Sequence, residues 1–85
     1  MFVARIVITL KRTVNDPQGQ TIRGGLLALG FGSVEGVRAG KYMEVYLREG
    51  SREAAARRVA DMCGRLLANP VIEEYRFELE HVPDP

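Results

Sequence analysis

Residues 2–10 read FVARIVITL, and apolar side chains occupy every second position of this stretch. The alternate positions that form one fully apolar set are Phe2, Ala4, Ile6, Ile8 and Leu10. The other set mixes Val3 and Val7 with Arg5 and Thr9. A period of two is typical of a β-strand with different environments on its two faces. The sequence therefore predicts a strand over residues 2–10 that has one core face and one mixed face.

A helix is predicted to begin at Asp16-Pro17. The Asp16 side chain can accept a hydrogen bond from a free helix amide, and proline suits the first helical position. Apolar residues then follow at helical spacing, at Ile22, Leu26 and Leu29. Gly24 and Gly25 each cost about 1 kcal/mol relative to alanine inside a helix. We therefore expect their backbone to pack closely against a neighbour, and a break at Gly24 is the alternative.

The rest of the chain predicts two extended segments, a helix and a last strand. Residues 34–39 and 41–48 read as extended segments separated near Gly40. Ser51 is a helix N-cap that precedes a run of strong helix formers. The apolar stripe of this helix consists of Val59, Met62, Cys63, Leu66 and Leu67. Asn69-Pro70 ends the helix, because proline cannot continue it, and alternation resumes over residues 73–80.

The order strand, helix, strand, strand, helix, strand predicts an α+β fold. Its most natural closure is a ferredoxin-like split β-α-β-β-α-β arrangement, with a four-stranded antiparallel sheet and both helices on one face. We expect a single domain over residues 1–80 and a polar, frayed tail over residues 81–85. The bare sheet face would expose more apolar surface than a small monomer usually does. We therefore expect a dimer or tetramer that forms through Val3, Val7 and Tyr46.

Composition excludes several classes of partner. The 85 residues carry twelve basic and eleven acidic side chains, so the formal charge is only +1 and no overall field recruits nucleic acid or an anionic membrane. No stretch approaches the roughly 18 apolar residues of a membrane span. The single cysteine cannot form an intramolecular disulfide, which favours a reducing cytoplasm. We expect a cytoplasmic protein with no nucleic-acid or membrane partner.

Catalytic and metal sites are not predicted. His81 stands alone in a polar tail, and Cys63 lies on the apolar stripe of a helix. Glu73 and Glu74 are adjacent in a strand, so their side chains point to opposite faces and cannot act as a paired acid and base. The Gly30-Phe31-Gly32 stretch follows a helix rather than preceding one and lacks a third glycine, which favours a turn over a dinucleotide loop.

One polar cluster is a candidate for binding. Arg38, Lys41 and Tyr42 flank Gly40, where they could bind a phosphate or a partner's carboxylate. The alternative is cross-strand salt bridging with Glu44 or Glu35. A second group of basic residues lies on the helix after Ser51, but nearby acids neutralise half of it, which favours a solvated face: Arg52, Arg57, Arg58 and Arg65.

Several phrases together resemble the PurS family, the small subunit of phosphoribosylformylglycinamidine synthase. They occur in the family's order over nearly the whole chain, from the first strand to Glu80. The phrases are Leu10-Lys11, Asn15-Asp16-Pro17-Gln18-Gly19, Val37-Arg38-Ala39-Gly40-Lys41-Tyr42-Met43-Glu44, Met62-Cys63, and Leu66-Leu67-Ala68-Asn69-Pro70-Val71-Ile72-Glu73-Glu74-Tyr75.

The resemblance implies a role in the fourth step of de novo purine synthesis. In that family a glutaminase subunit frees ammonia, and a large synthetase subunit that binds ATP and Mg aminates formylglycinamide ribonucleotide. The small subunit joins the two and is thought to help ammonia pass between them. The resemblance therefore implies no cofactor and no catalytic residue in this chain. The polar residues that we assign to partner contacts are Asp16, Gln18, Arg38, Lys41, Tyr42 and Glu73.

Two other functions share parts of the pattern. A regulatory module of the ACT type has the same order of strands and helices, and it places a ligand-contacting turn where Asp16-Pro17-Gln18-Gly19 lies. An acylphosphatase-like enzyme is suggested by residues 34–38, but its anion-binding loop should precede the first helix. Stabilisation by an amino acid would favour the first function, and turnover of an acyl phosphate would favour the second.

Overall fold

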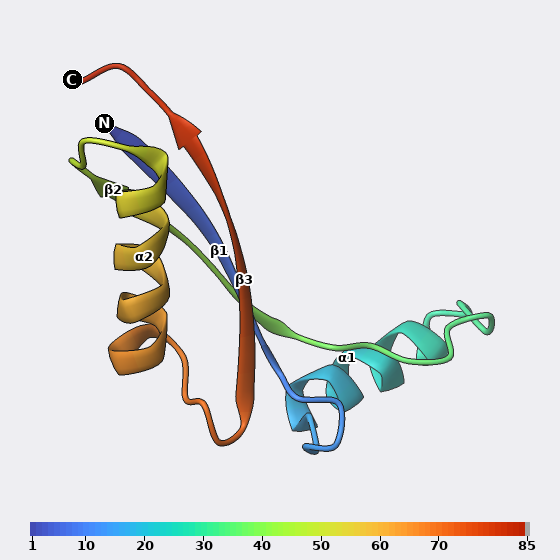
Figure 1. Ribbon diagram of the computed structural model, residues 1–85. Helices are drawn as coiled ribbons and strands as arrows, with labels where there is room; N and C mark the ends of the chain where they lie inside the picture. The colour runs from blue at the N-terminus through green and yellow to red at the C-terminus, as the bar shows by residue number, and fades with distance from the viewer. Residues whose placement is uncertain (85) are drawn as a thin grey trace.

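A three-stranded sheet, one covering helix and one projecting helical arm make up the fold of the computed structural model, which describes residues 1–84 (Figure 1). The elements in chain order are β1 (Phe2–Leu10), α1 (Pro17–Ala28), β2 (Gly40–Leu47), α2 (Arg52–Met62), the π-helical turn η1 (Cys63–Leu67) and β3 (Glu73–His81). The strands lie in the order β2-β1-β3, and both pairings are antiparallel. The predicted strand over residues 2–10 is thus the central strand.

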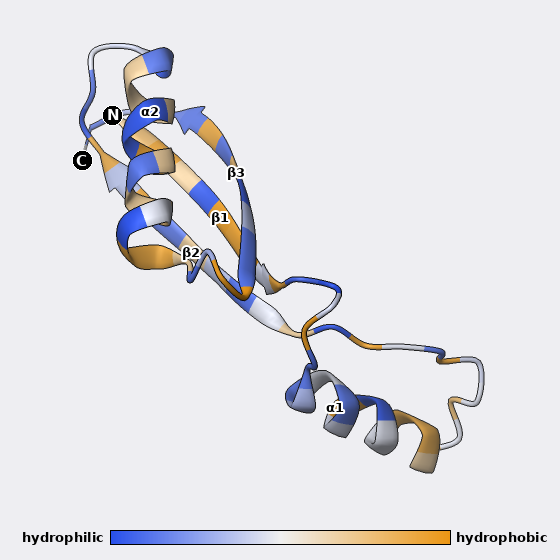
Figure 2. Ribbon diagram, turned by 60° about the horizontal axis from the view of Figure 1, so that its bottom comes forward, coloured by the Kyte–Doolittle hydropathy of each residue, from blue (hydrophilic) through white to orange (hydrophobic). Residues whose placement is uncertain are grey.

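The core lies between the apolar face of β1 and helix α2. Ile6 is paired with Met43 on β2 and with Phe77 on β3, so the three side chains share one face of the sheet. Figure 2 shows α2 lying along the sheet, with apolar segments of β1 beneath it. The buried core residues are Phe2, Ala4, Ile6, Ile8, Leu47, Ala55, Val59, Cys63 and Ala68. One helix is enough to cover this narrow sheet.

The predicted four-stranded sheet is wrong, because residues 34–39 do not form a strand. This segment runs beside α1 and bonds to it instead. The Ala39 amide donates to the Asp16 carboxylate over 2.8 Å, and the Arg23 Nε donates to the Glu35 carbonyl over 3.0 Å. Two of its backbone groups thus bond to side chains of the arm rather than to a neighbouring strand.

The placement of both helices on one sheet face is also wrong. Helix α1 points away from the sheet and, with residues 30–39, forms an arm (Figure 1). The chain spans 50 × 28 × 16 Å and its radius of gyration is 16.5 Å, whereas a compact chain of this length would have about 12 Å. The physical reason is that the apolar side chains of α1 are gathered less on one side of the helix than those of α2. Ile22 in α1 and Leu29 just after it remain 41% and 76% exposed.

The two glycines inside α1 do not serve close packing, which corrects the interpretation made from the sequence. A Cβ built on Gly24 or Gly25 would meet nothing within 4 Å, yet the helix runs unbroken from Pro17 to Ala28. It ends at Leu29, and Gly30 follows with a φ of 99°, in the left-handed region that favours glycine. The glycines at 24 and 25 thus weaken α1 without any compensating contact among residues 1–84.

Replacing Gly24 and Gly25 with alanine should stabilise α1 by about 1 kcal/mol per position. The expected result is slower amide hydrogen exchange in residues 20–29. Gly19→Ala is the control of opposite sign, because its Cβ would collide with the carbonyl oxygen of Val37. Faster exchange in the Gly24→Ala, Gly25→Ala variant would show that another molecule packs against the two glycines in solution.

The end of the second helix changes which residues are buried. The predicted apolar stripe included Leu66, but the helix widens into the π-helical turn η1 after Met62. A wider turn moves later side chains around the helix axis. Cys63 stays fully buried, whereas Leu66 is 83% exposed.

The C-terminal segment is held near the N-terminus. Strand β3 continues to His81, and the Val82 amide donates to the Met1 carbonyl over 2.8 Å. Asp84 forms ion pairs with the N-terminal ammonium and with Arg48, which lower the pKa of its carboxyl. Pro85, the last residue of the predicted tail, lies outside the described residues.

Candidate functional site: the arm root and the open sheet face

Asp16 ties the arm to its own base. Its side chain lies 4% exposed, one carboxylate oxygen accepts from the Gly19 amide over 2.9 Å, and the other accepts from the Ala39 amide over 2.8 Å. These two hydrogen bonds, first that from Gly19, lower the pKa of Asp16, and the charge of Arg38 adds to the effect. The sequence predicted the helix cap at Asp16 but not the second bond, which joins α1 to the chain entering β2.

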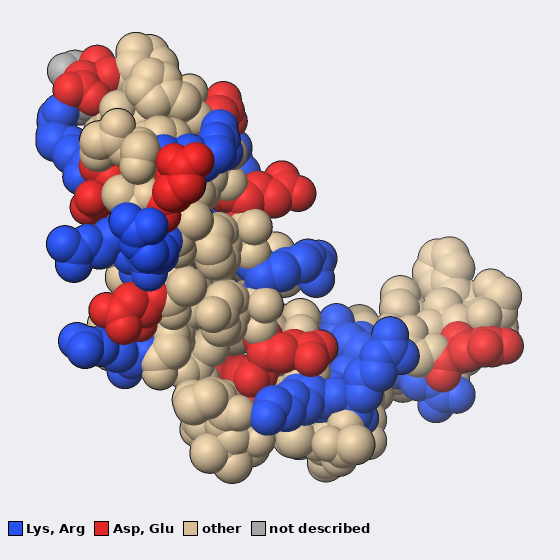
Figure 3. All heavy atoms as spheres, in the orientation of Figure 1, with Lys and Arg blue, Asp and Glu red and all other residues tan. Residues whose placement is uncertain are grey.

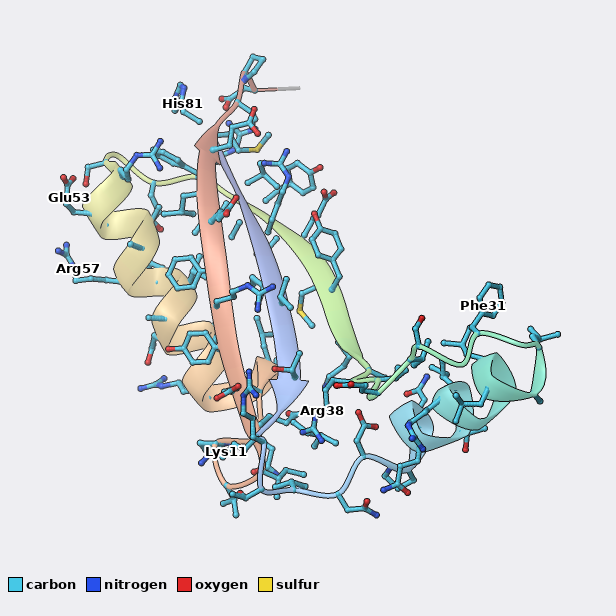
Figure 4. All side chains as sticks on the ribbon, turned by 90° about the vertical axis from the view of Figure 1, so that its right-hand side faces the viewer. Lys11, Phe31, Arg38, Glu53, Arg57 and His81 are labelled. Carbon is cyan, nitrogen blue, oxygen red and sulfur yellow. The ribbon has the colours of Figure 1, made fainter. Side chains whose placement is uncertain are left out.

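Arg38 holds the loop between β1 and α1. Its guanidinium donates to the carbonyl oxygens of Val14, Leu10 and Lys11 over 3.2, 3.1 and 2.8 Å. Figure 4 shows Arg38 and Lys11 together at the lower end of the sheet, where the arm begins. Because these donors are bonded within the single chain, Arg38 would influence a partner by fixing the shape of this loop rather than by a direct hydrogen bond.

The stability of the arm should fall at acid pH because of Asp16. A group with a lowered folded-state pKa stabilises above its unfolded pKa of about 3.9 and loses this effect as pH falls through its folded pKa. We expect the protection of the Gly19 and Ala39 amides against hydrogen exchange, relative to the intrinsic exchange rate at each pH, to fall as pH drops below about 4.

Asp16→Asn is the matched variant, because it removes the titrating group and keeps the size. This variant should lack that acid-induced loss while being less protected near pH 7. The same pH profile in both proteins would assign the effect to other carboxyls.

The remaining predicted partner residues separate into two places. Lys41 Nζ lies 3.4 Å from a Glu73 carboxylate oxygen, and the Asn69 amide donates to the other Glu73 oxygen over 2.7 Å. The Asn69 bond, followed by the Lys41 charge, lowers the pKa of Glu73. Gln18 is exposed on the first turn of α1. The cross-strand partner of Lys41 is thus Glu73, rather than Glu44 or Glu35 as the sequence suggested.

Tyr42 belongs to the sheet face that α2 does not cover. The hydroxyls of Tyr42 and Tyr46 both donate to the Glu44 carboxylate, over 2.9 and 3.2 Å. Partial burial and then the hydrogen bond to Glu44 raise the pKa of Tyr42, and the hydrogen bond to Glu44 raises the pKa of Tyr46. Arg5 donates to Glu80 over 2.6 Å on the same face. This open face is therefore a polar network with two large aromatic rings on its surface.

The three residues predicted for self-association differ in exposure. Val3 is 1% exposed within the single chain, Val7 is half-buried, and Tyr46 is 59% exposed. Tyr42, beside them, is 58% exposed. Tyr46 and Tyr42 are thus the apolar side chains that this face presents most openly.

Further exposed apolar side chains lie where the sequence analysis assigned no contact. Phe31 projects at the far end of the arm (Figure 4), and it is 56% exposed. Leu66 and Val71 are 83% and 76% exposed near the lower end of α2. Leu66 belonged to the predicted apolar stripe of the second helix and is left uncovered by the turn η1, whereas Phe31 and Val71 lie in connecting segments outside the helices.

Within residues 1–84, no group of three or more His, Cys, Asp and Glu side chains is arranged to hold a metal ion. Cys63 is buried, and burial raises the pKa of its thiol. Among the same residues, no helix is long and apolar enough to cross a membrane.

Comparisons with known proteins agree closely. The PurS family, described as phosphoribosylformylglycinamidine (FGAM) synthase, matches residues 3–81. The phosphoribosylformylglycinamidine synthase subunit PurS of Bacillus subtilis is 40% identical over 82 residues, which cover 96% of each chain. The crystal structure of Methanocaldococcus jannaschii PurS is 37% identical, covers 98% of this chain and 100% of that one, and gives a TM-score of 0.88. The structure of PurLQS from Thermotoga maritima matches with 28% identity and a TM-score of 0.83, over 94% of this chain and 99% of that one. The chain therefore belongs to the PurS family.

Proposed function

We propose that this chain is the non-catalytic small subunit of a formylglycinamidine ribonucleotide synthase in purine biosynthesis. The observation that carries the proposal is the match to the PurS family over residues 3–81. The M. jannaschii relative is described as one of the subunits of formylglycinamide ribonucleotide amidotransferase in the purine biosynthetic pathway. An ACT-like regulatory module, the alternative from the sequence, has no comparable support.

We infer that the chain bridges a glutaminase subunit and a large synthetase subunit and assists ammonia transfer between them. The structure of PurLQS supports this, because a chain with a TM-score of 0.83 to this one belongs to that structure. The shape of the chain fits such a role, since a projecting arm and an open sheet face offer two separate surfaces (Figure 1). ATP and Mg would be bound by the synthetase subunit, and the complex would act in the cytoplasm.

Self-association is the second part of the proposal. Strands β2 and β3 form the two edges of the sheet, and each leaves one row of backbone groups unpaired. The open face adds the exposed rings of Tyr42 and Tyr46. We infer a dimer or tetramer that covers part of this surface. A monomer in sedimentation at micromolar concentration would contradict it.

Reconstituted synthesis tests the proposal. The glutaminase and synthetase subunits from the same source are assayed with ATP and Mg, with and without this chain, using either glutamine or ammonia as nitrogen donor. Omitting the chain should abolish glutamine-dependent product formation and leave ammonia-dependent formation in place. Unchanged glutamine-dependent synthesis without the chain would overturn the proposal. Loss of both activities would assign the chain to the amination step itself rather than to ammonia transfer.

A further inference from the structure

A hollow at the base of the arm is lined by several arginine side chains, and some of their donors have no partner among residues 1–84. It has a volume of about 450 Å³ and lies between the β1–α1 loop, the start of α1 and residues 36–38. The polar side chains at its lining that matter here are Arg12, Thr13, Asn15, Gln20, Arg23 and Arg38. A neighbouring hollow shares Arg12 and Arg38 and adds Arg76 and Glu74. Figure 3 shows basic side chains gathered where the sheet meets the arm.

Two of these guanidinium groups keep free donors. Arg23 uses only its Nε, which donates to the Glu35 carbonyl, so both of its terminal nitrogens are unengaged. Arg12 has no hydrogen bond or ion pair with any side chain or carbonyl in residues 1–84, and it is exposed. Arg38 is different, because its terminal nitrogens hold the loop carbonyls and so fix the wall of the hollow.

The lining of the hollow carries more positive than negative charge. Asp16 is the one acidic residue at its lining, and both carboxylate oxygens accept backbone hydrogen bonds, from Gly19 and Ala39. Three arginines and this one carboxylate line the hollow, which leaves an excess of two positive charges. The acid in the neighbouring hollow, Glu74, lies on the sheet rather than on the arm, so an anion is favoured on the side of Arg12 and Arg23.

The donors fit a compact anion with several acceptor oxygens. Guanidinium groups pair with phosphate through two parallel hydrogen bonds. Neutral donors stand beside them, since the Gln20 amide gives only one hydrogen to Asn15, over 2.7 Å, and the Thr13 hydroxyl lines the same hollow. An extended acidic peptide would need a longer basic track than this concave site offers.

We propose that the hollow between Arg12 and Arg23 binds a phosphate group, either free phosphate or the phosphate of a small ester such as a nucleotide. This binding does not depend on the proposed role in a synthase complex. It would place an anion against the two segments that Asp16 and Arg38 join, and so would stabilise the arm in its present direction.

A titration of the full-length chain with inorganic phosphate tests the proposal. Amide NMR spectra at constant ionic strength should show saturable shifts at residues 12–20 and 36–38, with a dissociation constant of about 1 mM or below. ATP, ADP and adenosine are titrated in parallel experiments. Tighter binding of ATP than of phosphate, with no binding of adenosine, would assign a nucleotide phosphate, and equal binding would assign free phosphate.

The variants Arg12→Gln and Arg23→Gln should each weaken phosphate binding about tenfold, because each removes a charge-assisted hydrogen bond. Arg76→Gln is the matched control: it makes the same change of charge in the neighbouring hollow and should change affinity by less than about twofold. Equal weakening by Arg76→Gln, or the absence of saturable shifts at millimolar phosphate, would overturn the proposal. Tighter binding of a glutamate-rich peptide than of any phosphate compound would also overturn it.

Discussion

Replacing Ile6 with alanine is expected to lower the free energy of unfolding by about 2–5 kcal/mol. Ile6 is fully buried at the centre of β1, where it is paired with Met43 and Phe77 beneath α2. The change removes apolar contacts and leaves a cavity that a single helix over a narrow sheet can only partly close. Urea unfolding monitored by circular dichroism measures the loss.

Val7→Ala is the matched control for Ile6→Ala. Val7 is the next residue of the same strand, but it lies on the open face and is half-buried. Its replacement should cost less than half as much in dilute protein, because fewer contacts are lost. Equal losses at both positions would show that the open face is as tightly covered in solution as the face beneath α2.

Gly40→Ala is expected to cost about 3 kcal/mol, at the upper end of the range for overpacking. Gly40 is paired with Thr9 where β2 begins. A Cβ there would collide with the backbone carbonyl oxygen of Ile8 and lie 2.9 Å from the Thr9 Cγ2. Backbone cannot rotate away as a flexible side chain can, so the start of β2 would have to separate from β1. Loss of amide protection at residues 40–43 would report this separation.

Gly36→Ala provides the comparison, because a Cβ at this position would meet nothing within 4 Å. Gly36 lies in the segment that runs beside α1, only four residues before Gly40. The Gly36→Ala variant should keep a free energy of unfolding within about 0.5 kcal/mol of that of the original chain, as expected for a surface change. If both variants were equally tolerated, β1 and β2 would not approach each other as closely as the structure indicates.

The sequence predicted the elements that depend on local signals. Alternation over residues 2–10 identified β1, and Ser51 with its following helix formers identified the start of α2, whose cap bond from the Ala54 amide to the Ser51 hydroxyl is 3.1 Å long. Asp16 and Pro17 likewise marked the start of α1. Capping groups and side-chain periods act over a few residues, so they can be read without knowing the tertiary structure.

The arm could not be predicted because it depends on competition between distant segments. Residues 34–39 read as an extended segment, but the Ala39 amide bonds to the Asp16 carboxylate and the Glu35 carbonyl to Arg23, so the segment lies beside α1. A helix whose apolar side chains are gathered on one side gains more by covering a sheet, and α2 is the more one-sided of the two helices. The position of α1 therefore depends on how its apolar residues are distributed around the helix.

The candidate site was predicted in part. Arg38 and Asp16 were recognised as polar residues of interest, but their contacts with loop carbonyls and with the Ala39 amide became visible only in three dimensions. Arg12 and Arg23 were not singled out, since isolated arginines carry no spacing signal. They are brought to one hollow because α1 turns away from the sheet instead of packing on it.

The assembly of the three purified subunits tests whether this chain joins the two larger ones. Light scattering after size-exclusion chromatography measures the mass of complexes formed from the synthetase subunit, the glutaminase subunit and this chain. We expect a complex that contains both larger subunits only when this chain is present. Stable association of the two larger subunits in its absence, with no gain of mass when it is added, would show that the chain does not bridge them.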